Sequence, residues 1–266
     1  MGIKLEPPIT ESITILMIVA HPDDIEFGAG GSAAVWTAAG ATVIYCIVTD
    51  GSAGSNKPGE DLAQLVKTRQ AEQIEAAAKV GVHDVRFLGY KDGTLQPTLE
   101  LRRDLTRLIR EVKPHRVVIM DPRAILMADD EHGFYYINHP DHRATGEASL
   151  HAVFPSAGTR PIFPELLDEG LEPHDVKELY LNMAETSNIA VDISPVWEQK
   201  IEALLCHRSQ VGEDVVPMIR RWDEETGKLV GVQFAETFQV MRFGAPPNSD
   251  GGNGQITDGA GAPSAE

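Results

Sequence analysis

The hydrophobic residues of this chain fall into short continuous runs separated by polar, glycine-rich or amphipathic stretches. Runs of about four to eight apolar residues are typical of strands buried on both faces of a parallel sheet. They lie at residues 13–20, 42–49, 85–88 and 116–120, and two later ones lie at residues 179–183 and 189–193. We therefore expect a strand at each of these places.

Segments with helical periodicity alternate with these runs. Apolar residues recur at helical spacing over residues 61–80 and 99–112, and Gly81 and Pro114 then end the two predicted helices. Shorter helices are expected at residues 32–39, 142–153 and 195–207. This alternation predicts an α/β fold: a Rossmann-like, mostly parallel sheet with helices on both faces and an active site at the carboxyl end of the strands.

The remaining segments suggest a simple organisation. Residues 1–12 are expected to form an N-terminal arm and residues 13–244 a single domain, whereas residues 245–266 have almost no large apolar side chain and are expected to be a disordered tail. Residues 129–138 are polar and aromatic and are expected to form a loop.

The charge balance narrows the range of partners. Lysine and arginine total 23 against 40 aspartate and glutamate, which gives a formal charge of -17. Such a chain is poorly suited to nucleic acid or an anionic membrane, because both attract cationic surfaces. We expect no membrane anchor, and we expect the two cysteines, which lack metal-type spacing, to be reduced core thiols of a cytoplasmic protein. The oligomeric state is open, and a homo-oligomer is compatible with the sequence.

Two clusters carry candidate chemistry, and the first directly follows the first predicted strand. It contains His21, Asp23 and Asp24, at the edge where open α/β sheets bind ligands. An imidazole, a carboxylate and a spare carboxylate together favour a metal site. The alternative is a polar turn in which Asp24 caps the next helix.

The second cluster contains His139 and His142, separated by a proline and Asp141. A His-x-x-His pair alone is a weak signal. Combined with the first cluster, however, it supplies two histidines and a carboxylate, which is a recurring open ligand set of catalytic zinc. The same donors also suit iron or another divalent ion.

Together the two motifs resemble those of the PIG-L/LmbE-like metal-dependent de-N-acetylases. That family includes deacetylases of N-acetylglucosaminyl lipids, of mycothiol and bacillithiol precursors and of chitobiose. The resemblance covers residues 13–238. Weaker matches are the Thr-Asp-Gly turn at residues 49–51, the Arg69 and Glu72 pair, the segment at residues 200–210, and Glu236 followed by Phe238.

The resemblance implies that a metal ion, Zn²⁺ or alternatively another divalent ion such as Fe²⁺, is held by His21, Asp24 and His142. It implies that Asp23 is the general base that deprotonates the attacking water. His139, off the metal, would stabilise the oxyanion or serve as an acid.

The resemblance further implies that Arg69 and Asp92 bind sugar hydroxyls. Arg69 could instead form an ion pair with Glu72, and Asp92 could belong to a plain Asp-Gly turn. His207 lies in the family-like segment, but it could equally interact with a helix end through its charge.

The chain departs from the family pattern at two places. Some members carry a tyrosine two residues before the first histidine of the second motif, where this chain has Ile137, although Tyr135 and Tyr136 lie just upstream. Many members have glutamate straight after the Asp-Asp pair, where this chain has Ile25. A catalytic tyrosine is therefore an open question, and the substrate cannot be fixed from the sequence.

The leading hypothesis is a metal-dependent hydrolase that uses activated water to remove an acetyl group from the amide nitrogen of an N-acetylglucosamine-like small molecule. One alternative keeps the metal core in an amidase or deacylase of thiol conjugates or natural-product intermediates. Another is a nucleotide-binding Rossmann module suggested by Gly28, Gly30 and Gly31, but their spacing is not Gly-x-Gly-x-x-Gly.

Overall fold

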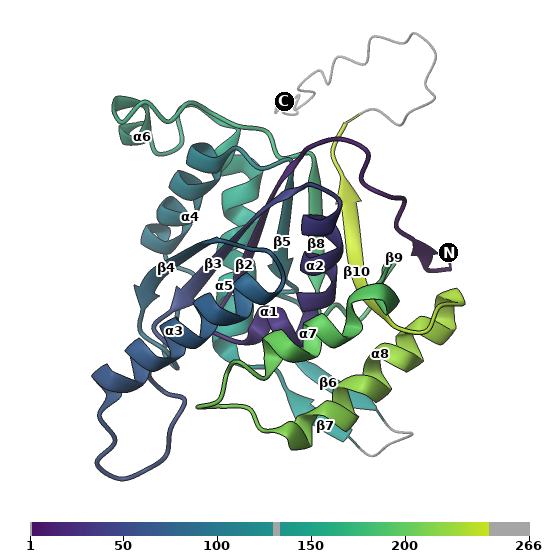
Figure 1. The fold of residues 1–266 in the computed structure, drawn as a ribbon. Coiled ribbons are helices and arrows are strands. Elements are labelled where there is room, and N and C mark those ends of the chain that lie inside the picture. The colour runs from purple at the N-terminus through teal and green to yellow at the C-terminus, as the bar shows by residue number, and fades with distance from the viewer. Residues whose placement is uncertain (1, 130–133, 245–266) are drawn as a thin grey trace, which may run out of the picture.

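A computed structural model describes residues 2–129 and 134–244 of the chain. Its main sheet has eight strands in the order β1-β9-β10-β8-β5-β2-β3-β4 (Figure 1). Strands β8, β5, β2, β3 and β4 pair in parallel, and β10 runs antiparallel to both of its neighbours. The bounds are β1 (Lys4–Leu5), β2 (Thr14–Val19), β3 (Thr42–Thr49), β4 (Asp84–Tyr90), β5 (Arg116–Met120), β8 (Glu178–Asn182), β9 (Ile189–Asp192) and β10 (Ala235–Arg242). The predicted α/β class with a mostly parallel sheet is confirmed.

The central strands are buried on both faces, as their continuous apolar runs predict. Alternate residues of β2 enter different cores: Ile15 and Met17 pack into one apolar cluster, and Leu16 and Ile18 pack into the other. Helices α2, α3 and α7 contribute to the first cluster and α4 and α5 to the second. The described helices are α1 (Asp24–Gly28), α2 (Gly30–Ala38), α3 (Leu62–Lys79), α4 (Leu99–Val112), α5 (Pro140–His151), α6 (Glu165–Asp168), α7 (Trp197–Leu204) and α8 (Val216–Val230), with short turns η1 (Ala152–Ala157), η2 (Ser194–Val196) and η3 (Glu213–Val215).

The two long amphipathic helices begin and end where local sequence signals place them. The Asp61 side chain accepts a hydrogen bond from the backbone N–H of Gln64 at the start of α3, and Thr98 accepts one from Leu101 at the start of α4. These caps satisfy backbone N–H groups that lack helical partners.

Both cysteines are free and buried. None of the described helices is long and apolar enough to cross a membrane.

The chain after β2 becomes helical earlier than the helix expected at residues 32–39. It is helical from Asp24, so Gly28 lies in α1 and Gly30 and Gly31 begin α2. A Cβ atom on Gly28 would lie 2.5 Å from Asn182 Nδ2, and one on Gly31 would lie 2.8 Å from Ile193 Cγ2. These two glycines therefore permit close packing of the helices.

Three other regions contain structure that the pattern did not predict. The predicted loop at residues 129–138 is wrong in part, because β6 (Leu126–Asp129) pairs antiparallel with β7 (Phe134–Ile137). Strand β1 in the N-terminal segment pairs with β9. Helix α8 and strand β10 were likewise not predicted. The predicted disordered tail, residues 245–266, lies outside the described residues.

Candidate metal centre

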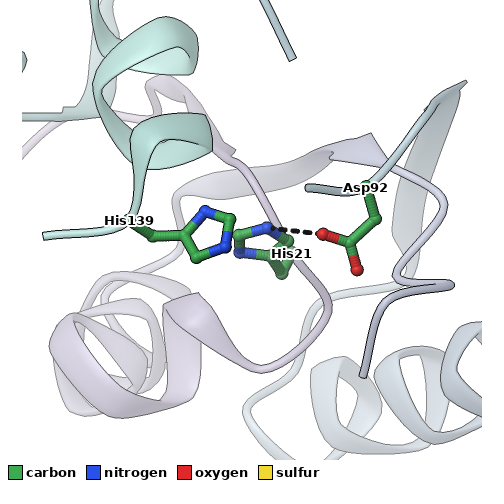
Figure 2. Close-up of side chains that lie close together, drawn as sticks. All are labelled: His21, Asp92 and His139. Carbon is green, nitrogen blue, oxygen red and sulfur yellow. Dashed lines mark ion pairs between the residues drawn. The ribbon is translucent and has the colours of Figure 1, made fainter. Parts of the chain in front are cut away.

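The two sequence clusters meet at the carboxyl edge of the sheet. His21 follows β2, Asp92 follows β4, and His139 precedes α5. Figure 2 shows the side chains of these three residues close together, although more than 110 residues of chain separate the first and last. The parallel order of β2, β3 and β4 brings the ends of β2 and β4 to the same edge.

Three buried ligand atoms form a compact group at this edge. His21 Nδ1 lies 3.2 Å from His142 Nε2, His142 Nε2 lies 3.1 Å from Asp24 Oδ1, and His21 Nδ1 lies 3.4 Å from Asp24 Oδ2. In a tetrahedral zinc site with ligand bonds of about 2.0–2.1 Å, neighbouring donors are about 3.3 Å apart. The two histidine nitrogens have this spacing, and the Asp24 carboxylate faces each of them with a different oxygen at a similar distance. The group can therefore offer three ligands to one ion.

In each histidine, the ring nitrogen that faces away from the ligand group (the outer nitrogen) lies close to an acceptor of the protein. The Asn138 side-chain amide donates to the carbonyl of Ala124, so its Oδ1 faces His142 and accepts from Nδ1 at 2.9 Å. His21 Nε2 lies 3.1 Å from Asp92 Oδ1. Because each outer nitrogen faces an acceptor, it carries the hydrogen, and the inner nitrogens Nδ1 of His21 and Nε2 of His142 keep lone pairs for a cation.

A second group, His21, Asp92 and His139, also has ligand atoms within 4.8 Å of one another (Figure 2). It would use His21 Nε2, which faces Asp92 and therefore carries the hydrogen. His139 Nδ1 accepts a hydrogen bond from the backbone N–H of Asp141, which places the hydrogen of this ring on Nε2. The available lone pairs thus favour the group of His21, Asp24 and His142.

The electrostatic surroundings of His21 favour a positive charge. Burial opposes a charge on the imidazole, but Asp24, Asp141 and Asp92 outweigh burial and raise the pKa of His21 to about 12. These surroundings suit a divalent cation at the same place.

Asp23 lies next to the ligand residue Asp24 in the sequence, but its side chain contacts other residues. Its backbone φ is 103°, in the left-handed region that residues with a side chain seldom adopt. Gln73 Oε1 accepts from its backbone N–H at 2.9 Å, and Arg69 Nη2 contacts its Oδ2 at 3.2 Å. Burial and neighbouring Asp24 raise the pKa of Asp23 to about 6, against the opposing charge of Arg69.

Arg69 is buried and clamps the turns that carry these residues. It donates to the carbonyl oxygens of Pro22 at 2.7 Å and Gly51 at 2.9 Å. The alternative partner Glu72 instead accepts hydrogen bonds from Ser209. The guanidinium thus joins the turn after β2 to the turn after β3.

A buried polar network lies behind Asp23. Gln73 Nε2 donates to Glu26 at 3.0 Å, and His207 Nε2 lies 3.1 Å from Glu26 Oε2. Burial opposes a charge on His207, but Glu26 and Asp23 raise its pKa above the ordinary value. Helix α7 ends at Leu204, so His207 acts through Glu26 rather than at the helix end.

Several residues of the site were not assigned from the sequence. Asn138 and Asp141 stood in the second motif without a role, and Glu26 and Gln73 gave no signal beyond their helical positions. Tyr136 is 36% exposed in β7, and the Tyr135 side chain lies outside the described part of the structure. The only signal that could have indicated these two residues was their place next to the histidines of the second motif: Asp141 directly precedes His142, and Asn138 directly precedes His139.

The fold and the site define a class: an α/β protein with a His/Asp/His group that could hold a metal ion at the carboxyl edge of a mostly parallel sheet. The PIG-L family, described as GlcNAc-PI de-N-acetylase, matches residues 16–153. The chain belongs to this family.

Relatives extend the match beyond that segment. The diacetylchitobiose deacetylase of Thermococcus kodakarensis is 32% identical over 91% of this chain and 88% of the relative. A probable N-acetyl-alpha-D-glucosaminyl L-malate deacetylase 2 of Bacillus anthracis is 26% identical over 86% of this chain and 95% of the relative. The solved N,N'-diacetylchitobiose deacetylase from Pyrococcus horikoshii, complexed with its inhibitor MPG, has a TM-score of 0.80 and 31% identity and covers 90% of this chain and 87% of its own.

Proposed function

We propose that this protein is a zinc-dependent hydrolase that removes the acetyl group from the amide nitrogen of an N-acetylglucosamine-type substrate. The observation that carries this proposal is the group of His21, Asp24 and His142 in a chain of the PIG-L family. The two imidazole nitrogens lie 3.2 Å apart, and each lies 3.1–3.4 Å from one oxygen of the Asp24 carboxylate. The relatives named above, which are deacetylases of amino-sugar compounds, support the substrate class.

The residues present fit a zinc ion. Two imidazole nitrogens and one carboxylate oxygen suit zinc, and iron is the alternative. When bound, the ion polarises an amide carbonyl and lowers the pKa of a coordinated water to about 7. The protein's own contribution is to hold the three donors, to accept and return a proton, and to meet the charge that develops on the amide oxygen.

Asp23 is proposed as the general base. It follows the His21 turn directly and precedes the ligand Asp24, and its side chain is 15% exposed, so water and substrate can reach it. Its carboxylate takes the proton from the attacking water and returns it to the leaving amine. A carboxyl group with a pKa near 6 can do both at neutral pH.

His139 is proposed to stabilise the developing oxyanion. Its ring centroid lies 4.7 Å from that of His21, and its side chain is 38% exposed. Burial and the charge of His21 lower the pKa of His139 below its ordinary value, so the ring is neutral near pH 7. With Nδ1 accepting from Asp141, the hydrogen on Nε2 is available to the amide oxygen.

Arg69 remains a proposed substrate-binding residue. The resemblance implies the same role for Asp92, but the contacts of both residues limit what they can offer a sugar. Arg69 already donates to Pro22 and Gly51, and the Asp92 side chain is 5% exposed. Contacts with sugar hydroxyls would therefore use only the exposed edge of each group.

Acetate release from purified zinc-loaded protein tests the function. Diacetylchitobiose, N-acetylglucosamine and N-acetylglucosaminyl malate are the amino-sugar substrates, and an amide with a longer acyl chain on a non-sugar amine is the comparison. We expect acetate from at least one amino sugar. Reaction of the longer acyl amide alone would favour the deacylase alternative, and no hydrolysis of either kind would contradict the proposal.

A further inference from the structure

The carboxylate of Asp92 lies between two N–H groups in the interior of the site. Its Oδ1 lies 3.1 Å from His21 Nε2, and Figure 2 marks this ion pair by a dashed line. Its Oδ2 accepts from the backbone N–H of Ala53 at 2.9 Å. Both oxygens are therefore engaged by the protein. Little of this side chain is left for a substrate.

The turn that presents Asp92 is tied to the helix that carries the other histidine ligand. Asp141, next to His142 in the first turn of α5, accepts from the backbone N–H of Gly93 at 2.7 Å through Oδ2 and from that of Leu95 at 3.1 Å through Oδ1. Asp141 is completely buried. The position of Asp92 is thus set by the same helix that positions His142.

We propose that Asp92 is a positioning residue, which holds the His21 imidazole so that Nδ1 faces Asp24 and His142. An imidazole can rotate about its side-chain bonds and can carry its hydrogen on either nitrogen. A carboxylate at Nε2 fixes both choices, and Asp141 keeps that carboxylate in place. This inference rests on the proposed metal centre, and it gives Asp92 a role in metal affinity rather than in sugar binding.

The test measures zinc affinity and substrate binding separately for Asp92→Asn. One amide oxygen cannot accept from both His21 and Ala53, so the amide NH₂ would face one of the two N–H groups. Loss of such a partner of a metal ligand lowers metal affinity by about 10–100-fold. Competition with a zinc-chelating dye gives the affinity without reference to activity, and acetate release from diacetylchitobiose at saturating zinc gives KM.

Asp50→Asn is the matched control. Asp50 also lies at the carboxyl edge of the sheet, and its Oδ1 accepts from the backbone N–H of both Ser52 and Asp92, while its Oδ2 lies 3.7 Å from Lys91 Nζ. An asparagine keeps the Oδ1 contacts and removes the same charge. We expect its zinc affinity to stay within about threefold of the wild type, because the His21 contact is preserved.

For Asp92→Asn we expect the fall in zinc affinity, a KM within about twofold of the wild type, and recovery of turnover as zinc is raised. Unchanged zinc affinity with a raised KM would show that Asp92 contacts substrate and would overturn the inference. Wild-type protein that releases no acetate, while the variant still binds zinc more weakly, would reject the function and keep the inference.

A second variant keeps the test decisive if Asp92→Asn does not fold. Asp141→Asn leaves Asp92 intact but weakens one of the two bonds to the following turn, and it also changes the carboxylate that lies 3.5 Å from His21 Nε2. We expect Asp141→Asn to bind zinc more weakly than the wild type and Asp50→Asn do, but more tightly than Asp92→Asn does. Wild-type affinity in Asp141→Asn, or two zinc ions bound per chain with His139 required for the second, would contradict the inferred arrangement.

Discussion

Asp23 and Asp24 are neighbours in the sequence, yet the structure gives their carboxylates different surroundings. The backbone of Asp23 is left-handed, with φ at 103°, and its carboxylate contacts Arg69, whereas the carboxylate of Asp24 joins the ligand group. Such a conformation costs on the order of 1–3 kcal/mol in a residue with a side chain. Gln73 Oε1 accepts a hydrogen bond from the Asp23 backbone N–H, and Arg69 donates to the carbonyl of Pro22. These two bonds hold the turn in place, so that the two neighbouring carboxylates keep different partners.

Replacing Asp23 with asparagine tests the base assignment. Asparagine tolerates the left-handed region and keeps the shape of the side chain, so the fold and the bound metal should persist. Turnover should fall by about 10²–10⁴-fold, the usual contribution of general acid–base catalysis. Elemental analysis and acetate release measure the two effects, and His142→Ala, which should lose both metal and turnover, is the control. Undiminished turnover in Asp23→Asn would remove Asp23 from the mechanism.

His207 does not belong to the ligand group, but it contacts Glu26 in the buried polar network next to Asp23. Both side chains are completely buried and 3.1 Å apart. Removing one partner of such a pair leaves an uncompensated buried group, so His207→Ala should lower the free energy of unfolding by about 3–5 kcal/mol. His207→Gln can still donate to Glu26 and should lose less.

Denaturant unfolding of both His207 variants measures these changes. The adjacent Arg208 forms an exposed ion pair with Glu75, and Arg208→Ala should leave stability nearly unchanged because exposed pairs contribute little. Equal losses in His207→Gln and His207→Ala would show that the contact with Glu26 is not what stabilises the protein.

At the scale of elements, the packing of α2 against Ile193 requires a glycine at residue 31 but not at residue 30. A Cβ on Gly31 would lie 2.8–2.9 Å from three carbon atoms of Ile193, whereas a Cβ on Gly30 would meet its nearest atom at an ordinary 3.6 Å. Both positions lie in the first turn of α2. The two glycines therefore form a matched pair.

Gly31→Ala should destabilise the protein by about 1–3 kcal/mol, because Ile193 or the helix must move. Gly30→Ala should be neutral or stabilising by up to about 1 kcal/mol, since alanine is the better helix former. Denaturant unfolding with constant slope measures both changes. Similar effects in the two variants would show that helix propensity, and not the contact with Ile193, governs this position.

Elements with strong local signals were predictable, and those that depend on distant contacts were not. Helix α4 was predicted at its observed bounds, because Thr98 and the amphipathic pattern mark it locally. The helical position of the glycines in α1 and α2 could not be predicted, because the close approach of Asn182 and Ile193 is set by segments far along the chain. Strand β10 escaped notice because its partly exposed, mixed sequence has no continuous apolar run.

The same distinction applies to the site. The pairing of two motifs brought together His21, Asp24 and His142 from sequence resemblance, and the structure places their donor atoms within reach of one ion. The hydrogen bonds of Asp92, Asp141 and Gln73 could not be predicted, because they depend on the positions of backbone groups in other elements. Spacing along the chain identifies ligands more readily than the groups that orient them.

At the scale of the whole molecule, the proposed metal would join segments that lie far apart in the chain. His21 and Asp24 follow β2, whereas His142 begins α5. A ligand that binds only the folded state stabilises it, by about 4 kcal/mol at a thousandfold excess over Kd. For a protein of this size, that corresponds to a rise in Tm on the order of 10 °C.

We therefore expect chelator-treated protein to lose turnover and to unfold at a lower temperature, and added zinc to restore both. The formal charge of -17 makes unspecific attraction of divalent cations a real competitor, and magnesium at the same concentration controls for it, because magnesium disfavours imidazole ligands. His142→Ala provides the matched protein, in which zinc should raise Tm little more than magnesium does. If zinc and magnesium raised the Tm of the wild type equally, the stabilisation would come from attraction to the negative surface. A site with imidazole ligands should instead prefer zinc to magnesium.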